Sequence, residues 1–182
     1  MLLILIGKTA SGKDLIVNKL CESGWDKITT YTSRPIRKGE IPETTYHYIT
    51  EEEFKQKINE GFFLEYKVYS TEFGDWYYGS PLEELVEIKE NENKVIILTP
   101  NGYKDLKAKT NIKHKAIYVY ANNDTIRKRL IMRGDDVLEA ERRLNHDNID
   151  FKGIENEVDK IVYNNNGENI NDVIIRILKE VN

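Results

Sequence analysis

A glycine-rich loop near the start of the chain has the residues needed to bind phosphate. It fits the pattern G-x-x-x-x-G-K and reads Gly7-Lys8-Thr9-Ala10-Ser11-Gly12-Lys13. Its two glycines let successive backbone N–H groups point at one anion, and Lys13 adds a cation. An apolar run, Leu2–Ile6, precedes the loop and a helical pattern follows it. We therefore interpret residues 7–14 as a site for nucleotide phosphates rather than a glycine turn with a surface lysine.

Asp14 departs from this pattern, because Ser or Thr normally follows the lysine and offers a hydroxyl to magnesium. Its carboxylate could ligate Mg²⁺ directly or through a water, since magnesium prefers oxygen ligands. A negative charge in the first turn of a helix is also favoured by the helix dipole alone. We predict a metal role for Asp14, because a carboxylate beside phosphates repels them unless a cation lies between.

Two arginines on a second loop could bind another anion. The run from Tyr31 to Glu40 holds Arg34 and Arg37, three residues apart, among turn-forming residues. Forked guanidinium donors at this spacing suit a phosphate held from two sides. A solvated basic turn explains the stretch equally well when it is taken alone.

Composition places these loops in a globular protein of 182 residues with 40% hydrophobic and 32% charged residues. One good core and one domain fit this length. The net charge of −4 does not favour binding to nucleic acid or membranes. Cys21 is the only cysteine, so a disulfide framework is excluded and a reducing cytoplasm is expected.

Buried-type strands alternate with helical patterns, which predicts an α/β fold with a doubly wound parallel sheet. The predicted strands of this sheet are residues 2–6, 27–31, 95–98, 116–120 and 161–163. The predicted helices are residues 12–23, 123–133, 137–148 and a last one from 169. An insert at about 31–80 has short strands and many tyrosines. Ser80-Pro81-Leu82-Glu83 predicts a capping box that opens a helix.

Three further segments follow the arginine loop in order: Tyr46-His47-Tyr48, Phe63-Leu64-Glu65-Tyr66 and Tyr77-Tyr78-Gly79-Ser80. With them the chain resembles the guanylate kinases over nearly its whole length. The resemblance implies a three-layer, doubly wound parallel sheet of P-loop kinase type in a single domain, 1–182. It also implies a core (1–30 and 81–182), a small mixed-strand lobe for a nucleoside monophosphate (about 31–80) and a helical lid (about 122–147).

The resemblance assigns most acceptor-binding roles to the lobe. Arg34, Arg37, Tyr46 and Tyr78 would hold the phosphate of GMP, and Glu65 would read the guanine edge. Thr30, Ser80 and Thr99 complete the acceptor set. A carboxylate suits a purine that offers N–H donors, which agrees with the role of Glu65. Ordinary strand packing is the alternative for the tyrosines.

The donor side is implied in the same way. ATP would be held by residues 7–14 with Arg129 and Asn164, the last touching adenine. The lid would carry Arg133 and Arg143 to the transferred phosphoryl group, so the catalytic residues would be Lys13, Arg34, Arg133 and Arg143. This lid is one residue shorter than the usual spacing, which leaves Arg142 as the alternative to Arg143.

One segment departs from the family. A D-x-D pair is expected before Q-G, but the chain reads Ile97-Leu98-Thr99-Pro100-Asn101-Gly102 and lacks both carboxylates. The first is associated with metal-bound phosphates and the second with the guanine 2-amino group.

We therefore expect an ATP- and Mg²⁺-dependent kinase of GMP or dGMP, with Asp14 as metal ligand, acting as a monomer or weak homodimer. The alternatives are a deoxynucleoside monophosphate kinase of different base preference and a binding module that has lost catalysis. A pure binding module has no need for Gly7, Gly12 and Lys13.

Overall fold

The structure is a computed structural model that describes residues 1–37, 39–71, 74–89 and 91–181. Close contacts divide the chain into two compact units. The first comprises Met1–Lys27, Glu90–Pro100 and Lys113–Asn182, and the second comprises Ile28–Lys89 and Asn101–Ile112. Lys38 of the arginine loop lies outside the described residues. Each unit is built around its own sheet.

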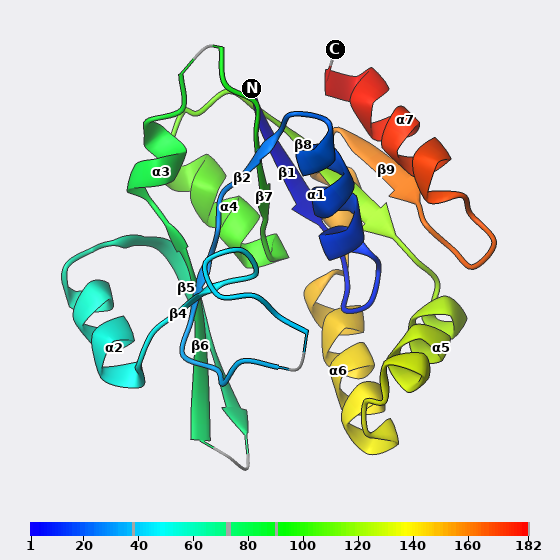
Figure 1. Cartoon of the computed structure of the whole chain (residues 1–182), viewed down its shortest axis with the longest axis horizontal. Helices are drawn as coiled ribbons and strands as arrows, with labels where there is room; N and C mark the ends of the chain where they lie inside the picture. Colours follow the sequence, from blue (N-terminus) through cyan, green and yellow to red (C-terminus); the bar gives the residue numbers. More distant parts are fainter. Residues whose placement is uncertain (38, 72–73, 90, 182) are drawn as a thin grey trace. The chain divides into compact units, whose positions relative to one another are not determined.

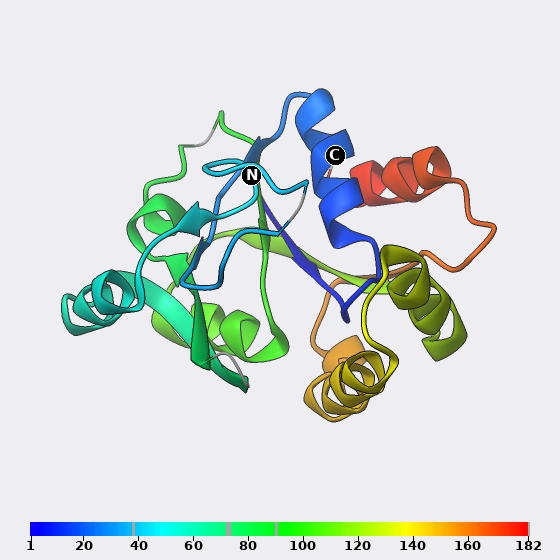
Figure 2. The same cartoon turned by 60° about the horizontal axis from the view of Figure 1, so that its bottom comes forward.

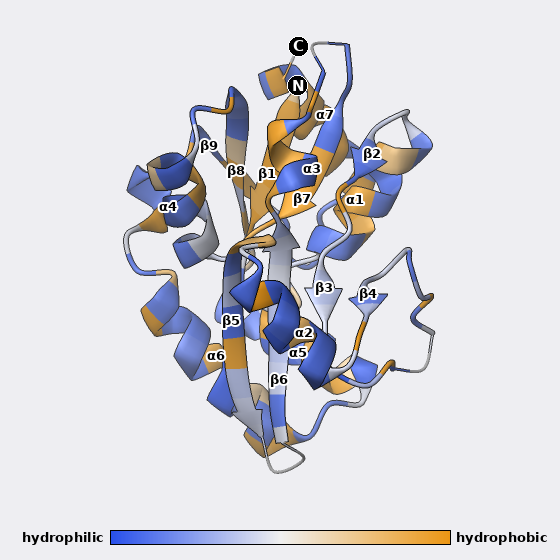
Figure 3. Ribbon diagram, turned by 90° about the vertical axis from the view of Figure 1, so that its left-hand side faces the viewer, coloured by the Kyte–Doolittle hydropathy of each residue, from blue (hydrophilic) through white to orange (hydrophobic). Residues whose placement is uncertain are grey.

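The sheet of the first unit has five parallel strands in the order β2-β7-β1-β8-β9 (Figure 1). They are β1 (Leu2–Ile6), β2 (Asp26–Lys27), β7 (Lys94–Ile97), β8 (His114–Tyr120) and β9 (Lys160–Tyr163). Strand β1 is central, and all of its residues are buried and apolar (Figure 3). A parallel strand inside a sheet covered on both faces requires such a run. The predicted parallel α/β sheet is confirmed.

Helices α1 (Lys13–Glu22) and α7 (Ile170–Val181) lie side by side on one face of this sheet (Figures 1 and 2). Ile16 and Leu20 of α1 and Ile177 of α7 are fully buried there. Helices α5 (Asn123–Arg133) and α6 (Val137–Asp150) pack on each other, and the short helix η1 (Ile154–Asn156) follows them. Gly134 ends α5 with a φ of 83°, which glycine adopts without strain. The predicted helix pair and its break are confirmed.

The second unit has a four-stranded mixed sheet in the order β4-β3-β6-β5. Its strands are β3 (Tyr31–Thr32), β4 (His47–Tyr48), β5 (Phe63–Thr71) and β6 (Gly74–Pro81). Its helices are α2 (Glu51–Asn59), α3 (Glu83–Val86) and most of α4 (Pro100–Lys109). Thr50 and Glu53 cap α2 reciprocally. None of the described helices is both long and apolar enough to cross a membrane.

Two predictions about this region are wrong. The strand expected at 27–31 is two strands, because Lys27 ends β2 in one sheet and Tyr31 begins β3 in the other. The capping box expected at Ser80 is absent, because Ser80 and Pro81 belong to strand β6 and α3 begins after Leu82. The Ser80 hydroxyl donates to Glu65 across the strand pair.

Candidate active site

The phosphate loop is a tight turn held by its own lysine. Lys13 Nζ donates to the carbonyls of Gly7 at 2.7 Å and Lys8 at 2.9 Å. Gly12 has a φ of 98° and caps α1, with no side chain of the described residues bonded at that helix end. The first amides of a helix have no partner within it, so this end presents N–H groups to an anion. The loop therefore has the backbone form that phosphate binding requires.

Two side chains from distant parts of the same unit fix the back of the loop. Arg129 donates to the carbonyls of Ala10 at 3.1 Å and Asn164 at 2.9 Å. The buried Asn164 side chain donates to the carbonyl of Ser11 at 2.8 Å. A Cβ on Gly12 would lie 2.4 Å from the Asn164 amide nitrogen, so only glycine fits. Both residues predicted for ATP thus support the loop, while their contact with adenine stays a prediction.

Burial lowers the pKa of Lys13, and the charges of Asp14 and Asp147 partly offset this effect. Neighbouring negative charge therefore favours the protonated form of Lys13. A nucleotide phosphate would supply more of that charge. The positive charge of Lys13 therefore favours binding of an anion to the loop.

In the second unit, Arg34 is buried and its guanidinium is held from several sides. It donates to Glu40 through both terminal nitrogens, at 3.0 and 2.8 Å, and through Nε to the Tyr78 hydroxyl at 3.0 Å. Its guanidinium carbon also lies 5.6 Å from the centre of the Tyr46 ring. Arg37 is exposed, and its backbone N–H donates to Glu40 at 2.6 Å. The second unit thus places Tyr46 and Tyr78 beside the Arg34 guanidinium, and Glu40 joins Arg34 to the Arg37 backbone.

Glu40 is the centre of this network. Burial raises its pKa, but hydrogen bonds from Arg34, the Arg37 amide and Tyr48 outweigh burial and bring the pKa to about 2. Burial also raises the pKa of Tyr48, and its bond to Glu40 helps to bring that pKa to about 12. Glu40 therefore stays ionised, and fixes Arg34, over the whole physiological range.

This depressed pKa predicts a pH dependence of stability. Because the folded pKa lies below the ordinary 4.5, the stabilisation is complete above pH 4.5 and is lost as the pH falls towards 2. We expect Glu40→Gln to flatten the fall in unfolding free energy between pH 4.5 and 2, measured by urea denaturation. Glu52→Gln, on an exposed turn of α2, controls for the lost charge. A slope equal to that of the wild type would contradict the role of Glu40.

Two of the residues predicted to read the base, Glu65 and Ser80, lie together in the second unit. Ser80 donates from its hydroxyl to Glu65 at 2.7 Å. Burial raises the pKa of Glu65, and this hydrogen bond lowers it in part. A Cβ on Gly102 would lie 2.8 Å from the Glu65 carboxyl carbon, so glycine leaves room for the carboxylate. Thr30, half-buried at the start of the unit, accepts from the His47 amide through its carbonyl at 2.9 Å.

Comparison with known protein families identifies the family of the chain. Residues 1–181 match the family model described as guanylate kinase. The chain belongs to the guanylate kinase family. Similar curated proteins include the guanylate kinase of Clostridium tetani, 30% identical over 146 residues, which cover 77% of this chain and 66% of that protein. The guanylate kinase of Helicobacter pylori strain 26695 is 29% identical over 185 residues, which cover 98% of this chain and 86% of that protein.

Solved structures agree on the fold. The guanylate kinase of Anaplasma phagocytophilum matches all of this chain and 84% of its own, with a TM-score of 0.73 at 20% identity. An uncharacterised protein from Eubacterium ventriosum matches with a TM-score of 0.56 at 14% identity. The chain spans about two thirds of the length of the clostridial relatives, 66% and 64%.

The arginines of the predicted lid pair with acidic residues of helices α5 and α6 or of the link between these helices. Arg133 pairs with Asp135, and Arg127 pairs with Glu141. Arg142 and Arg143 share Glu139, at 2.7 and 2.8 Å from their Nε atoms. Hydrogen bonds from Arg142 and Arg143 lower the pKa of Glu139 to about 2 against burial. Because Glu139 holds both, the choice between Arg142 and Arg143 stays open, and each must leave its carboxylate to reach a phosphoryl group.

The expected strand-end carboxylates are absent, as the sequence shows. Ile97 ends β7, and Thr99 follows in the first unit. A guanylate kinase fold implies Mg²⁺ with ATP, so the remaining donors matter. Among the described residues, no group of three or more His, Cys, Asp or Glu side chains could hold a metal. The charges of Asp14 and Asp147 act on Lys13, however. Asp14, in the first turn of α1 next to Lys13, stays the carboxylate predicted for an ion that arrives with nucleotide phosphates, as Mg²⁺ usually does.

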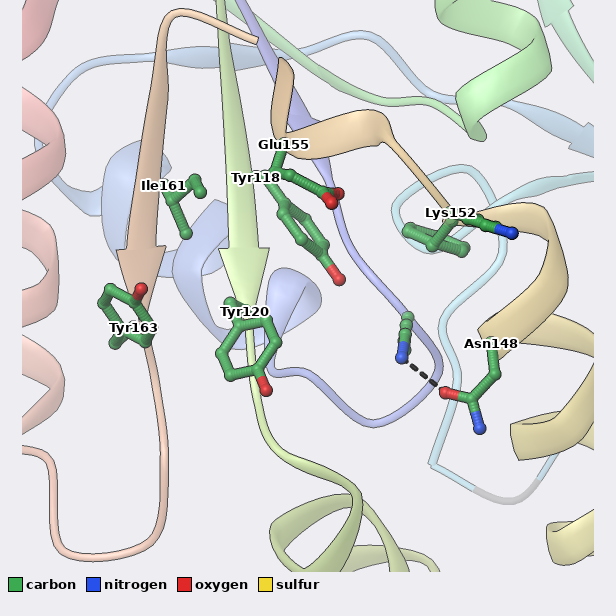
Figure 4. Close-up of a pocket in the computed structure, with 9 residues that line it drawn as sticks. Tyr118, Tyr120, Asn148, Lys152, Glu155, Ile161 and Tyr163 are labelled. Carbon is green, nitrogen blue, oxygen red and sulfur yellow. Dashed lines mark hydrogen bonds between the residues drawn. The ribbon is translucent and has the colours of Figure 1, made fainter. Parts of the chain in front are cut away.

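The end of α6 meets the loop through residues that sequence reasoning missed. Asn148 accepts from Lys8 Nζ at 2.5 Å, which places it at the wall of a pocket of about 440 Å³ beside β8 and β9 (Figure 4). Asp147, next to Asn148, accepts from the Thr9 amide at 2.6 Å. The signal that could have revealed Asp147 is its spacing from Ala140 and Leu144, which places a carboxylate on the buried stripe of the helix.

Proposed function

We propose that the chain transfers the γ-phosphoryl group of ATP to GMP or dGMP. The observation that carries the proposal is the intact phosphate loop, with Lys13 bonded inside it, in a member of the guanylate kinase family. A family member used only as a binding module has no need for this loop. Arg34 contacts Tyr78 and Glu40, the Arg37 amide donates to Glu40, and Tyr46 packs on Tyr78; this group supports an acceptor phosphate site in the second unit.

Phosphoryl transfer needs alignment and charge neutralisation more than covalent chemistry. Lys13 would neutralise the outer phosphates of ATP, and Arg34 and Arg37 would orient the acceptor. Arg133 and Arg143 would exchange their acidic partners for the transferred group, and lid closure would exclude water. Mg²⁺, when bound, supplies positive charge shared between the donor phosphates. Asp14, exposed in the first turn of α1, stays the residue that the sequence predicts for that ion.

We further infer one domain, 1–182, made of a core (1–30 and 81–182), an acceptor lobe (about 31–80) and a lid (about 122–147). The partners proposed are ATP and GMP or dGMP, with no nucleic acid and no membrane, for a cytoplasmic monomer or weak homodimer.

A coupled assay of ADP release across nucleoside monophosphates tests the function. We expect ATP-dependent turnover with GMP or dGMP above that with AMP, CMP and UMP. A preference for another base would favour the deoxynucleoside monophosphate kinase alternative, for which the lost carboxylates at 97 and 99 are the specific observation. Binding of GMP without turnover would favour the binding module.

Base choice should also be looser than with an intact aspartate pair. Thr99 offers a neutral hydroxyl where a carboxylate would read the guanine 2-amino group, and neutral partners make weaker hydrogen bonds. We expect Thr99→Asp to increase the ratio of kcat/KM for GMP over IMP by about tenfold. Thr110→Asp, on the carboxyl side of α4, controls for the added charge. An unchanged ratio in Thr99→Asp would remove Thr99 from base reading.

A further inference from the structure

The sheet of the first unit carries a pocket on the face opposite α1 and α7. Val119 of β8 and Val162 of β9 are buried in one cluster with residues of α1 and α7. Successive side chains of a strand point to opposite faces, so the neighbours of these valines face the other way. The neighbours that line the pocket of about 440 Å³ are Tyr118, Tyr120, Ile161 and Tyr163 (Figure 4). Pockets that bind small molecules have volumes of about 300–1,000 Å³.

This pocket is separate from the site proposed for ATP. Helix α1, whose first amides would bind phosphate, lies on the other face of the sheet. The described residues that line the pocket include neither Arg129 nor Asn164, which are predicted to hold the donor. Of the phosphate loop, these lining residues include Lys8 alone, and its side chain is bonded to Asn148. A molecule in the pocket would therefore occupy a site to which the proposed function assigns nothing.

Tyr118 gives this pocket a buried hydrogen-bond donor. The residue is 5% exposed, and its hydroxyl makes no hydrogen bond within the part of the chain that the structure describes. Figure 4 shows this hydroxyl pointing away from strand β8 into the pocket. Burial raises the pKa of Tyr118, and the neighbouring Tyr120 and Glu155 raise it further, so the hydroxyl stays protonated at neutral pH. A buried donor without an acceptor is costly, and a ligand with an acceptor at this point would remove the cost.

The aromatic side chains of the pocket suit a flat ring. The rings of Tyr120 and Tyr163 meet edge to face with their centres 5.3 Å apart. Phe151 lies beside Tyr118, with 5.9 Å between the ring centres. Tyr163 is 49% exposed, so its ring has surface left for a further contact. Aromatic side chains of this kind stack on the flat face of a nucleobase whatever its sequence identity.

An acceptor at the rim narrows the class of ligand. Glu155 is an exposed lining residue, and Figure 4 shows its carboxylate beside the Tyr118 ring. The carboxylate accepts hydrogen bonds, whereas the Tyr118 hydroxyl donates one. A phenyl group matches neither of them. Adenine carries a ring nitrogen that accepts and, next to it, an amino group that donates, both in the plane of one ring.

We propose that this pocket binds the base of an aminopurine nucleoside. Tyr118 donates to a ring nitrogen, Glu155 accepts from the amino group, and Tyr163 stacks on the ring. The site lies outside the donor and acceptor sites, so the proposal does not rest on phosphoryl transfer. Adenosine binding in the pocket without kinase turnover would reject the proposed function alone, and turnover without such binding would reject this proposal alone.

Fluorine NMR of the full-length protein labelled with 3-fluorotyrosine locates the bound nucleoside. Signals are assigned from single Tyr→Phe variants, and adenosine is the probe. We expect the signals of Tyr118, Tyr120 and Tyr163 to shift along one binding curve, while that of Tyr66, exposed in the second unit, stays in place. Shifts confined to Tyr46 and Tyr78, or no shift at all, would overturn the proposal.

Tyr118→Phe removes the hydroxyl and keeps the ring. We expect it to raise the Kd for adenosine by about tenfold, followed through the Tyr163 signal, because the ring nitrogen loses its donor. Tyr66→Phe is the matched control outside the pocket and should leave the Kd unchanged. An unchanged Kd in Tyr118→Phe would place the nucleoside elsewhere and overturn the proposal.

Two substitutions at exposed positions keep the test independent of folding. Glu155→Ala should raise the Kd for adenosine by about tenfold and leave that for purine riboside, the same ring without the amino group, unchanged. Tyr163→Ala should raise the Kd of both ligands by about tenfold, because both stack in the same way. Equal losses for the two ligands in Glu155→Ala, or none for either in Tyr163→Ala, would overturn the proposed contacts.

Discussion

Replacing Lys13 with alanine is expected to lower kcat by about a hundred- to a thousand-fold, the usual effect of removing one group that stabilises charge in the transition state. Lys13 carries the cation of the phosphate loop, and its ammonium is already oriented by the carbonyls of Gly7 and Lys8. The variant also leaves those two carbonyls without their donor, so the loop should loosen. Steady-state kinetics with ATP and GMP, beside a thermal unfolding curve, measure both effects.

Lys19→Ala is the matched control, because Lys19 lies on the same helix and pairs at the surface with Glu22. Its loss should change turnover by less than about twofold, since exposed ion pairs contribute little. If Lys13→Ala folded and turned over like the wild type, the phosphoryl transfer proposed for this loop would be untenable.

Replacing Arg34 with alanine is expected to raise the Michaelis constant for GMP by about ten- to a hundred-fold and to leave that for ATP nearly unchanged. Losing a hydrogen bond to a charged group costs about 1.5–3 kcal/mol, which corresponds to that factor. Arg34 is 4% exposed and its guanidinium contacts Glu40 and Tyr78, so it is oriented before a phosphate arrives. Initial rates, measured with GMP and then ATP as the varied substrate, give the two Michaelis constants that this prediction compares.

Arg37→Ala separates phosphate binding from folding of the lobe. Arg34→Ala leaves Glu40 without its main cation and should lower the unfolding temperature as well. Arg37 is exposed and contacts Glu40 through its backbone N–H, which alanine keeps, so its variant should raise the Michaelis constant for GMP with little change in stability. Equal weakening of ATP and GMP by either variant would contradict a separate acceptor site.

The phosphate loop was predictable because its chemistry is local. Leu2–Ile6, the two loop glycines and Lys13 are consecutive in the sequence, and each has the form that the structure needs. The helices predicted at 123–133 and 137–148 were equally readable, since Asn122, Asp136 and Gly134 mark helix ends, and the second helix extends two residues further, to Asp150.

Strand membership was less readable at 27–31 and at Ser80. Both segments carry local signals, a run of β-branched residues and a capping pattern, that tertiary pairing overrode. Lys27 pairs with Val95, while Tyr31 pairs with His47 and Gly79, so one run serves two sheets. Ser80 lies opposite Glu65 in the antiparallel pair of β5 and β6, and its hydroxyl donates a hydrogen bond to the Glu65 carboxylate.

By itself the sequence determined the family, the parallel sheet, the phosphate loop and the arginine loop, because each depends on residues close together in the chain. Only the tertiary structure decided which partners hold them. Glu40 as the anchor of Arg34, Glu139 as the shared partner of two lid arginines, and Asp147 at the Thr9 amide are matters of side-chain placement. Asp147 and Thr9 are 138 residues apart, and no local pattern specifies a contact over that distance. Packing of α6 against α5 and Ala10 brings them together, because burying an apolar stripe fixes every side chain on that face, including a charged one.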